Sequence, residues 1–211
     1  MFPNGSMYKG QMLIDKNNSQ TSGGGEMRCG YGIQKWVDGA VYEGEWVSNK
    51  AEGKGTFWHA EGDIYTGQFK ADQANGFGVY THVNGSRYEG QWVNDVQQGQ
   101  GEETWVDGAK YVGKYKNGMK DGYGVYQWAD GSEFKGNWEE NKITGYGIYY
   151  WEDGRVYEGY WNQNNMHGQG LYKWPDGRQY EGSYVDDKKE GYGVYQYPDG
   201  RCYKGQWQNG K

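Results

Sequence analysis

Residues 145–161 read GYGIYYWEDGRVYEGYW, and this stretch decides the fold. Two runs rich in aromatic and β-branched residues flank the pair Asp153-Gly154, which is typical of a β-hairpin. Every proline of the chain stands just before such an Asx-Gly pair: Pro3, Pro175 and Pro198. Proline cannot adopt the positive φ of a two-residue type I′ turn. The pattern therefore predicts a three-residue loop that ends in a glycine bulge.

This loop sets the register of the two strands that it joins. With Glu152-Asp153-Gly154 as the loop, the residues on either side pair in a fixed order. The predicted pairs, all on one face, are Gly145–Trp161, Gly147–Gly159, Tyr149–Tyr157 and Trp151–Arg155. Large rings then lie beside glycines, so aromatic packing on glycine replaces a core of branched aliphatic residues.

The same elements recur along the chain every 23 residues. An aromatic-x-Gly-x-aromatic motif begins at Tyr42, Tyr65, Tyr88, Tyr111, Phe134, Tyr157, Tyr180 and Tyr203. Gly-x-Gly and Asx-Gly pairs recur in the same phase, and an earlier copy begins at Tyr8. We therefore predict a single array of about nine 23-residue repeats over residues 1–211, with an exposed loop inserted at about residues 17–27.

The repeats predict an all-β fold. One hairpin alone is marginally stable, so successive hairpins are expected to stack against each other. We expect an elongated, single-layer, twisted antiparallel sheet of stacked β-hairpins, which forms a solenoid-like rod. The 39 glycines of the chain are then part of this architecture and not of flexible linkers.

Composition and charge exclude several classes of protein. The chain has 22 basic and 28 acidic residues, and its net charge of −6 argues against nucleic acid and, less strongly, against acidic membranes as partners. No stretch resembles a transmembrane helix, and the N-terminus lacks the pattern of a signal peptide. The two cysteines, Cys29 and Cys202, lie far apart and fit a reducing, cytoplasmic compartment.

No residue pattern indicates catalysis, a cofactor or a metal site. Turn chemistry explains the repeated Asp-Gly pairs, and no helix follows Gly-x-Gly as dinucleotide binding requires. His59 and His82 occupy equivalent positions one repeat apart, which is roughly 10 Å and too far for a shared zinc ion. We therefore expect a protein that is not an enzyme.

The aromatic residues in the repeated positions are mostly structural, but a single-layer sheet does not bury both edges of every ring. The richest row lies in repeats five to eight and is the predicted partner-binding site: Tyr126, Trp128, Trp138, Tyr149, Trp151, Trp161, Tyr172 and Trp174. We expect these residues to line an exposed groove that receives a helix or an extended segment of a partner protein.

The segments YEGEW at Tyr42–Trp46 and GYGVYQWADG at Gly122–Gly131, with the 23-residue spacing, resemble MORN repeats. The resemblance covers nearly the whole chain. The departures are Met12, which replaces the closing aromatic residue of the first copy, and His59 and His82, which stand where later repeats have Trp. The resemblance to MORN repeats implies an elongated sheet of stacked hairpins with a binding role.

In the MORN family, such arrays are scaffolds of cilia and the cytoskeleton, including subunits of the axonemal radial-spoke head. They also occur in junction proteins that link membranes, and as accessory regions of lipid kinases and a methyltransferase. The leading hypothesis is a scaffold or adaptor that binds other proteins in a large assembly of the cilium, axoneme or other cytoskeleton. Its ciliary part rests on the resemblance alone.

Two other hypotheses remain. The second is a membrane or phosphoinositide adaptor, or an accessory region of a larger protein, whose candidate lipid contacts are Lys110, Lys114, Lys116, Lys120 and Lys135. Asp121 and Glu133 interrupt this cluster, so it ranks lower. The third is a secreted sugar- or choline-binding repeat protein, but such repeats are shorter and phased differently. Open edge strands also allow end-to-end or edge association with another copy.

Overall fold

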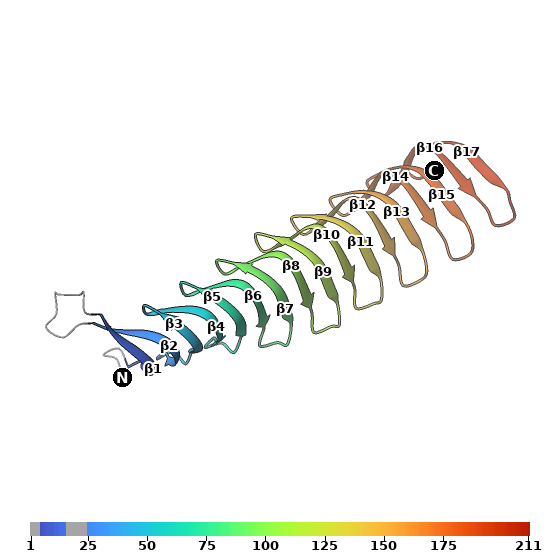
Figure 1. Cartoon of the computed structure of the whole chain (residues 1–211). Coiled ribbons are helices and arrows are strands. Elements are labelled where there is room, and N and C mark those ends of the chain that lie inside the picture. The colour runs from blue at the N-terminus through green and yellow to red at the C-terminus, as the bar shows by residue number, and fades with distance from the viewer. Residues whose placement is uncertain (1–4, 16–24) are drawn as a thin grey trace. The chain divides into compact units, whose positions relative to one another are not determined.

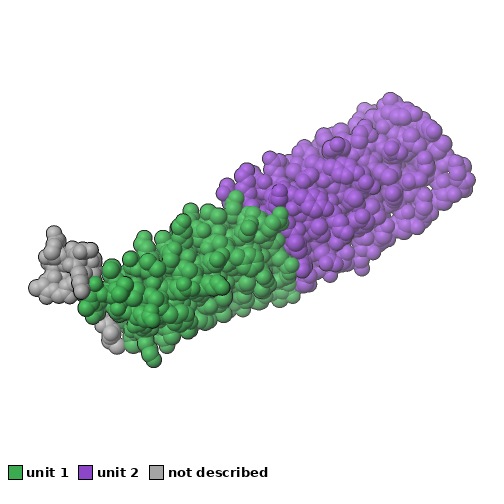
Figure 2. All heavy atoms as spheres, in the orientation of Figure 1, with its two compact units in different colours: residues 1–106 green, residues 107–211 purple. Residues whose placement is uncertain are grey.

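The computed structural model describes residues 5–15 and 25–211. In these ranges the regular elements are all β-strands, and none is a helix that could cross a membrane. The contacts divide the chain into two compact units, unit 1 (Met1–Val106) and unit 2 (Asp107–Lys211), which Figure 2 shows in green and purple.

Each unit is built from strands that follow one another along the chain (Figure 1). The strands of unit 1 are β1 (Met7–Asp15), β2 (Gly25–Lys35), β3 (Val41–Val47), β4 (Lys50–Trp58), β5 (Ile64–Lys70), β6 (Gln73–Thr81), β7 (Arg87–Val93) and β8 (Val96–Thr104). The strands of unit 2 are β9 (Lys110–Lys116), β10 (Met119–Gln127), β11 (Glu133–Glu139), β12 (Lys142–Tyr150), β13 (Val156–Asn162), β14 (Asn165–Lys173), β15 (Gln179–Val185), β16 (Lys188–Gln196) and β17 (Cys202–Trp207).

Consecutive strands pair antiparallel throughout both units. The ladder of unit 1 runs from β1 to β8. The ladder of unit 2 runs from β9 to β17. The predicted all-β sheet of successive antiparallel hairpins is therefore confirmed.

The register of the hairpin at residues 145–161 is the predicted one. Gly145 pairs with Trp161, Gly147 with Gly159 and Tyr149 with Tyr157. Across the loop, the Trp151 N–H donates to the Arg155 carbonyl at 3.0 Å, and the Gly154 N–H donates to the Trp151 carbonyl at 3.0 Å. Gly154 has a φ of +84°, as the glycine at the end of a three-residue loop requires. The repeated Asp also has a turn role, because one oxygen of Asp153 accepts the Arg155 N–H at 3.2 Å.

The core of each repeat is an aromatic ring that lies over two glycines, a tyrosine in every repeat except the one with Phe134. Tyr157 is fully buried, and its hydroxyl donates to the Tyr160 carbonyl at 3.0 Å. A Cβ atom on Gly159 would lie 2.6 Å from the Tyr157 hydroxyl and 2.6 Å from the Cα of Gly170 on the next strand. Any side chain at Gly159 would therefore collide with the ring and with the neighbouring backbone. The prediction that aromatic rings pack on glycine is confirmed.

A second kind of turn, which the sequence analysis missed, joins the last strand of one repeat to the first strand of the next. In Gln163-Asn164 both residues have positive φ, 49° and 74°, which defines a two-residue type I′ turn. The Asn164 side chain then accepts the N–H of Ile143 at 2.8 Å and so ties the turn to the preceding repeat. The signal was present as Asn, Asp or Gly every 23 residues: Asn49, Asp72, Asp95, Gly118, Asn141, Asn164, Asp187 and Gly210.

The predicted insertion at about residues 17–27 falls mainly outside the described residues, which omit 17–24. Residues 25–27 open strand β2, where Gly25 pairs with Asp15 and Glu26 pairs with Ile14. These last three residues therefore belong to the sheet and not to an exposed loop.

Candidate partner-binding site

The aromatic residues of unit 2 form two rows on one face of the sheet. In the first row, which we call the core ladder, neighbouring rings meet edge to face, with centroids 5.0–5.6 Å apart and planes at 81–89°. Its members are Tyr111, Tyr115, Phe134, Trp138, Tyr157, Trp161, Tyr180, Tyr184, Tyr203 and Trp207. Edge-to-face contact is the favoured geometry for packed rings, so this row is the structural core.

The second row, the stacked ladder, lies beside the Asx-Gly loops. A strand residue and the aromatic residue two positions later stack on each other, and each pair contacts the pair of the next repeat. Centroids of successive rings lie 4.5–5.5 Å apart, with planes at 33–57°. The members are Tyr126, Trp128, Tyr149, Trp151, Tyr172, Trp174, Tyr195 and Tyr197.

The eight residues of the predicted partner-binding site divide between the two rows. Six of them belong to the stacked ladder: Tyr126, Trp128, Tyr149, Trp151, Tyr172 and Trp174. Trp138 and Trp161 belong to the core ladder, where each is only 7% exposed. The Trp161 indole N–H also donates to the Gly147 carbonyl at 3.3 Å. These two residues therefore stabilise the sheet and offer little surface to a partner. The same holds for Tyr172 and Tyr195 of the stacked ladder, which are 7% and 9% exposed, so the surface of that row is formed mainly by its other members.

Two members of the stacked ladder, Tyr195 and Tyr197, were not among the residues predicted from the sequence. They follow Tyr172 and Trp174 by one repeat, so the 23-residue period could have identified them. Tyr195 stacks on Trp174 with a centroid distance of 5.5 Å, and Tyr197 stacks on Tyr195 at 4.9 Å. The ladder thus continues through the last loop of unit 2.

Arginine side chains border the stacked ladder on its loop side. The Arg155 Cζ lies 5.3 Å from the centre of the Trp151 ring, and its Nε lies 2.7 Å from Oδ2 of Asp153. The Arg155 guanidinium also donates to the Tyr172 hydroxyl at 3.1 Å. Arg178 and Arg201 repeat the contact on Trp174 and Tyr197, at 5.5 and 5.0 Å. The ladder is therefore an apolar strip with a charged border, as protein-binding surfaces commonly are.

The five lysines of the alternative lipid-binding hypothesis are not brought onto one face. Lys110, Lys114 and Lys116 alternate with the buried residues Tyr111 and Tyr115 along β9, so they point away from the aromatic face. The Lys120 ammonium instead lies 5.2 Å from the centre of the Tyr111 ring and 5.7 Å from that of Tyr126. The Lys135 ammonium is 2.7 Å from a Glu133 carboxylate oxygen.

Unit 1 carries its own aromatic row, in which histidines replace two of the tryptophans. His59 lies between Phe57 and Tyr80, with centroid distances of 4.6 and 5.7 Å. His82 contacts Tyr80 at 4.8 Å. The row therefore keeps its ring contacts where the sequence departs from the repeat pattern.

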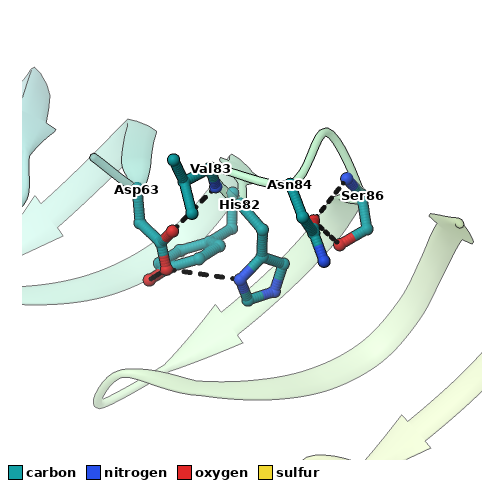
Figure 3. Close-up of polar contacts among 6 residues, drawn as sticks. Asp63, His82, Val83, Asn84 and Ser86 are labelled. Atoms are coloured by element: carbon teal, nitrogen blue, oxygen red, sulfur yellow. Dashed lines mark hydrogen bonds and ion pairs between the residues drawn. The ribbon is translucent and has the colours of Figure 1, made fainter. Parts of the chain in front are cut away.

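A carboxylate holds the histidine end of this row (Figure 3). Asp63 accepts the Val83 N–H at 2.8 Å, lies 3.2 Å from the His82 Nδ1, and accepts the Tyr80 hydroxyl at 2.7 Å. The hydrogen bond from Tyr80 is the main cause that lowers the pKa of Asp63. Burial, followed by the hydrogen bond to Asp63, raises the pKa of Tyr80 to about 12. The contact is a structural one, because both groups stay in their ordinary charge states at neutral pH.

No metal centre is found in the described ranges, because no three His, Cys, Asp or Glu side chains come together there in a way that would hold an ion. His82 pairs with Asp63, and His167 Nδ1 lies 3.7 Å from an Asp186 oxygen. Each of these is a contact between two side chains, fewer than the ligands that a structural zinc ion takes.

Comparison with known proteins identifies the repeat. The family model described as "MORN repeat" matches residues 27–41, 42–64, 65–87, 88–110, 111–133, 134–154, 157–177, 180–200 and 203–211. A comparison with curated proteins gave no significant match.

Two solved structures are similar to the chain. The TCP10 domain of CPAP from Danio rerio has 13% identity and a TM-score of 0.47, covering 93% of this chain and 94% of that chain. The TCP domain of SAS-4 from Drosophila melanogaster, in complex with a proline-rich motif of Ana2, has 10% identity and a TM-score of 0.44. It covers 74% of this chain and 85% of that chain. At such identities and TM-scores, neither likeness bears on function.

Proposed function

The chain belongs to the MORN-repeat family, and we propose that it is a non-enzymatic scaffold that binds partner proteins along the stacked ladder of unit 2. The observation that carries this proposal is the ladder itself. Eight rings from Tyr126 to Tyr197 stack in sequence along one strip, bordered by arginine–aspartate pairs. Tyrosine, tryptophan and arginine are the residues that most often dominate the binding energy of protein interfaces.

The geometry suits an elongated ligand. The ladder repeats the same ring pair every 23 residues, so a helix or an extended segment would meet equivalent rings at regular intervals. Rigid rings with few rotatable bonds also lose little entropy when a partner covers them. A partner that spans several repeats would gain from each of them.

The proposal is tested by affinity capture with matched variants. The chain is immobilised, proteins are captured from an extract of the source cells, and the captured set is identified. We expect the double variant Trp151→Gln/Trp174→Gln to lose specific partners, with an affinity decrease of at least about tenfold. The control is Tyr123→Gln, which removes a ring that is 57% exposed and points away from the aromatic face.

Thermal unfolding of each variant separates loss of binding from loss of folding. Partners that bind the folded double variant as well as the unchanged chain would contradict a role of the ladder. Loss of the same partners by Tyr123→Gln would place the binding surface on the other face of the sheet.

We further propose that the assembly is cytoskeletal, in a cilium or axoneme. This part is supported by the roles that MORN arrays have in other proteins. We expect the chain to stay in the pellet after nonionic detergent and to leave it at high salt, and the ladder double variant to leave it with detergent alone. Release of the unchanged chain together with membrane lipids would favour the lipid adaptor instead.

A lipid adaptor has weaker support, because Lys120 and Lys135 are engaged by rings and by Glu133, respectively. The candidate contacts that lie on one face of strand β9 are Lys110, Lys114 and Lys116. The test of the lipid adaptor is the reversal of these three charges, with binding to vesicles that contain anionic lipid as the measurement.

A further inference from the structure

Lys189 lies in a cage of aromatic rings. Its ammonium is 4.6–5.2 Å from the centres of four rings, which belong to Trp174, Tyr180, Tyr195 and Trp207. Contacts of this kind stabilise a cation through the negative faces of the rings. The fold of this chain therefore already holds one lysine ammonium among aromatic rings. We call these four rings the Lys189 cage.

The same position occurs once in every repeat. It is the second residue of β16, and five repeats earlier, in β6, it is Ala74. The residues that correspond to the four rings of the Lys189 cage are His59, Tyr65, Tyr80 and Trp92. Three of the four rings are therefore the same in the two repeats, His59 takes the place of Trp174, and alanine takes the place of the lysine.

A cavity of about 230 Å³ lies where the lysine would be. We call it the Ala74 pocket, and its lining is Phe57, His59, Tyr65, Phe69, Asp72, Ala74, Tyr80, Trp92 and Asp95. All of these residues belong to unit 1. The pocket thus has the rings of a cation cage and the space for a long side chain.

Two carboxylates also line the pocket. Oδ1 of Asp95 accepts the N–H of Ala74 at 2.7 Å, and Oδ1 of Asp72 accepts the N–H of Ala51 at 2.7 Å. Because both donors are backbone groups, the carboxylates are fixed at the pocket wall. Asp95 has no counterpart in the Lys189 cage, where Gly210 stands at the corresponding position. The pocket without a lysine is thus the one with the extra negative charge.

The negative charge of Asp95 also affects the pKa of a tyrosine that lines the pocket. Burial, together with the negative charge of Asp95, raises the pKa of Tyr65 to about 12. A cation in the pocket would lie close to this carboxylate, and charge complementarity in a partly buried site favours a positively charged ligand.

We propose that the Ala74 pocket binds a lysine side chain of a partner protein. Its ammonium lies against the rings, as that of Lys189 does, and Asp72 and Asp95 offset its charge. The proposal rests on the proposed function, because it names a chemical feature of the partner that a protein-binding scaffold would recognise.

Other repeats place the chain's own cations at this position. Arg28 lies with its Cζ 4.2 Å from the centre of the Trp46 ring, and Lys120 lies over Tyr111 and Tyr126. Ile143 and Met166 fill the position with apolar side chains. The two alanines, Ala51 and Ala74, leave a cavity, and the cavity at Ala51 already contains Arg28 in its lining. The Ala74 pocket is the one that we assign to an external cation.

The test uses the full chain and two short peptides that differ in one charge. The chain is labelled with ¹⁵N in its indole groups, and the Trp92 N–H, which donates to the Gly78 carbonyl at 3.1 Å, is the reporter. The probes are Ac-Gly-Lys-Gly-NH₂ and the same peptide with acetyl-lysine. We expect the lysine peptide to shift the Trp92 signal saturably, and the acetylated peptide to bind about tenfold more weakly or not at all.

Two variants of the chain match the peptides. Ala74→Lys fills the pocket from within, as Lys189 fills its own cage, so the lysine peptide should no longer shift the Trp92 signal. Lys189→Ala empties the cage in unit 2, which has Gly210 in place of Asp95, so the Trp207 signal should now respond to the lysine peptide, but with weaker binding than at Trp92. Equal shifts by both peptides, no shift of Trp92, or an unchanged response in Ala74→Lys would overturn the proposal.

The outcomes separate this proposal from the proposed function. A Trp92 signal that ignores the lysine peptide, in a chain whose partners still depend on Trp151 and Trp174, would remove the lysine site and leave the scaffold. A lysine peptide that binds, in a chain whose partners ignore the ladder double variant, would leave the lysine site and remove the ladder as the docking strip.

Discussion

The hydroxyl of the first tyrosine in the motif makes a hydrogen bond within its own repeat. It donates to the backbone carbonyl three residues later, at 3.0–3.2 Å, in Tyr8, Tyr42, Tyr65, Tyr88, Tyr111, Tyr157, Tyr180 and Tyr203. Phe134 occupies the same position without a hydroxyl and is as fully buried as Tyr111 and Tyr157. The ring alone is thus enough to fill the space over the glycines, and the hydroxyl adds a hydrogen bond.

This difference gives a matched pair of substitutions. We expect Phe134→Tyr to raise the free energy of unfolding by about 0.5–1.5 kcal/mol, because the new hydroxyl can donate to the Asn137 carbonyl. Tyr157→Phe should lower it by a similar amount. Urea unfolding of both variants measures the change. A loss of stability in Phe134→Tyr would mean that this repeat has no room for the hydroxyl.

The carboxylate of Asp63 gives a prediction about pH. Its pKa lies below the usual 3.8, mainly because Tyr80 donates to it, so the folded state favours the charged form. The stabilisation is therefore present above about pH 4 and is lost as the pH falls through the folded-state pKa. We expect Asp63→Ala to be less stable than the unchanged chain at neutral pH. The difference should shrink below about pH 4.

Alanine is a suitable replacement, because Ala40 and Ala109 occupy the equivalent position in other repeats. Denaturant unfolding at a series of pH values measures the difference. A difference that stays constant as the solution becomes acidic would show that the contribution of the Asp63 side chain to stability does not depend on its charge.

At the scale of the elements, the two turns of a repeat differ in how well the sequence revealed them. The Asx-Gly loop was predictable, because the position of Pro175 and Pro198 excludes a two-residue turn. The type I′ turn was hidden, because its first residue varies freely between Ala71, Glu140 and Gln163 while all of them adopt a positive φ. Because the residue type at the first turn position varies, the sequence does not reveal that its positive φ recurs in every one of these turns.

The division of the rings into two ladders was also beyond the sequence. Alternation along a strand correctly places Tyr149, Trp151 and Trp161 on one face. It does not give the depth of each ring, which depends on whether the ring lies over the glycine pairs or beside the loop. For this reason Trp138 and Trp161 were grouped with residues that lie in a different row.

The type I′ turn offers a stabilising substitution. Glu140 has a φ of 47°, and asparagine tolerates this left-handed region better than glutamate does. We expect Glu140→Asn to raise the free energy of unfolding by about 0.5–1 kcal/mol. The control is Glu139→Asn, which lies in strand β11 and should give no gain. Urea unfolding compares the two, and equal effects would exclude the turn as the cause.

At the scale of the whole molecule, the main contacts between strands join neighbours in the sequence. Stability in such a chain is close to a sum of repeat and nearest-neighbour contributions. A defect should therefore act locally. This holds within each of the two units, whose strands pair in sequence order.

We expect Gly159→Ala to show this localisation in amide hydrogen exchange. Its new Cβ would clash with Tyr157 and with the backbone at Gly170, so strands β12 to β15 should lose protection. The strands of unit 1 should keep theirs. Uniform loss of protection in every strand would indicate a single cooperative unit instead.

From Tyr42 onward the 23-residue register is unbroken, and this has a consequence for how such a chain can change. Deleting or duplicating one 23-residue period inside a unit brings together two strands whose sequences pair in the same register. Every side chain then stays on the same face of the sheet. An insertion of a single residue within a strand would move every later side chain of that strand to the opposite face of the sheet. We therefore expect the gene to tolerate recombination between its own repeats, so that the number of binding positions grows or shrinks by whole steps while each remaining step keeps its chemistry.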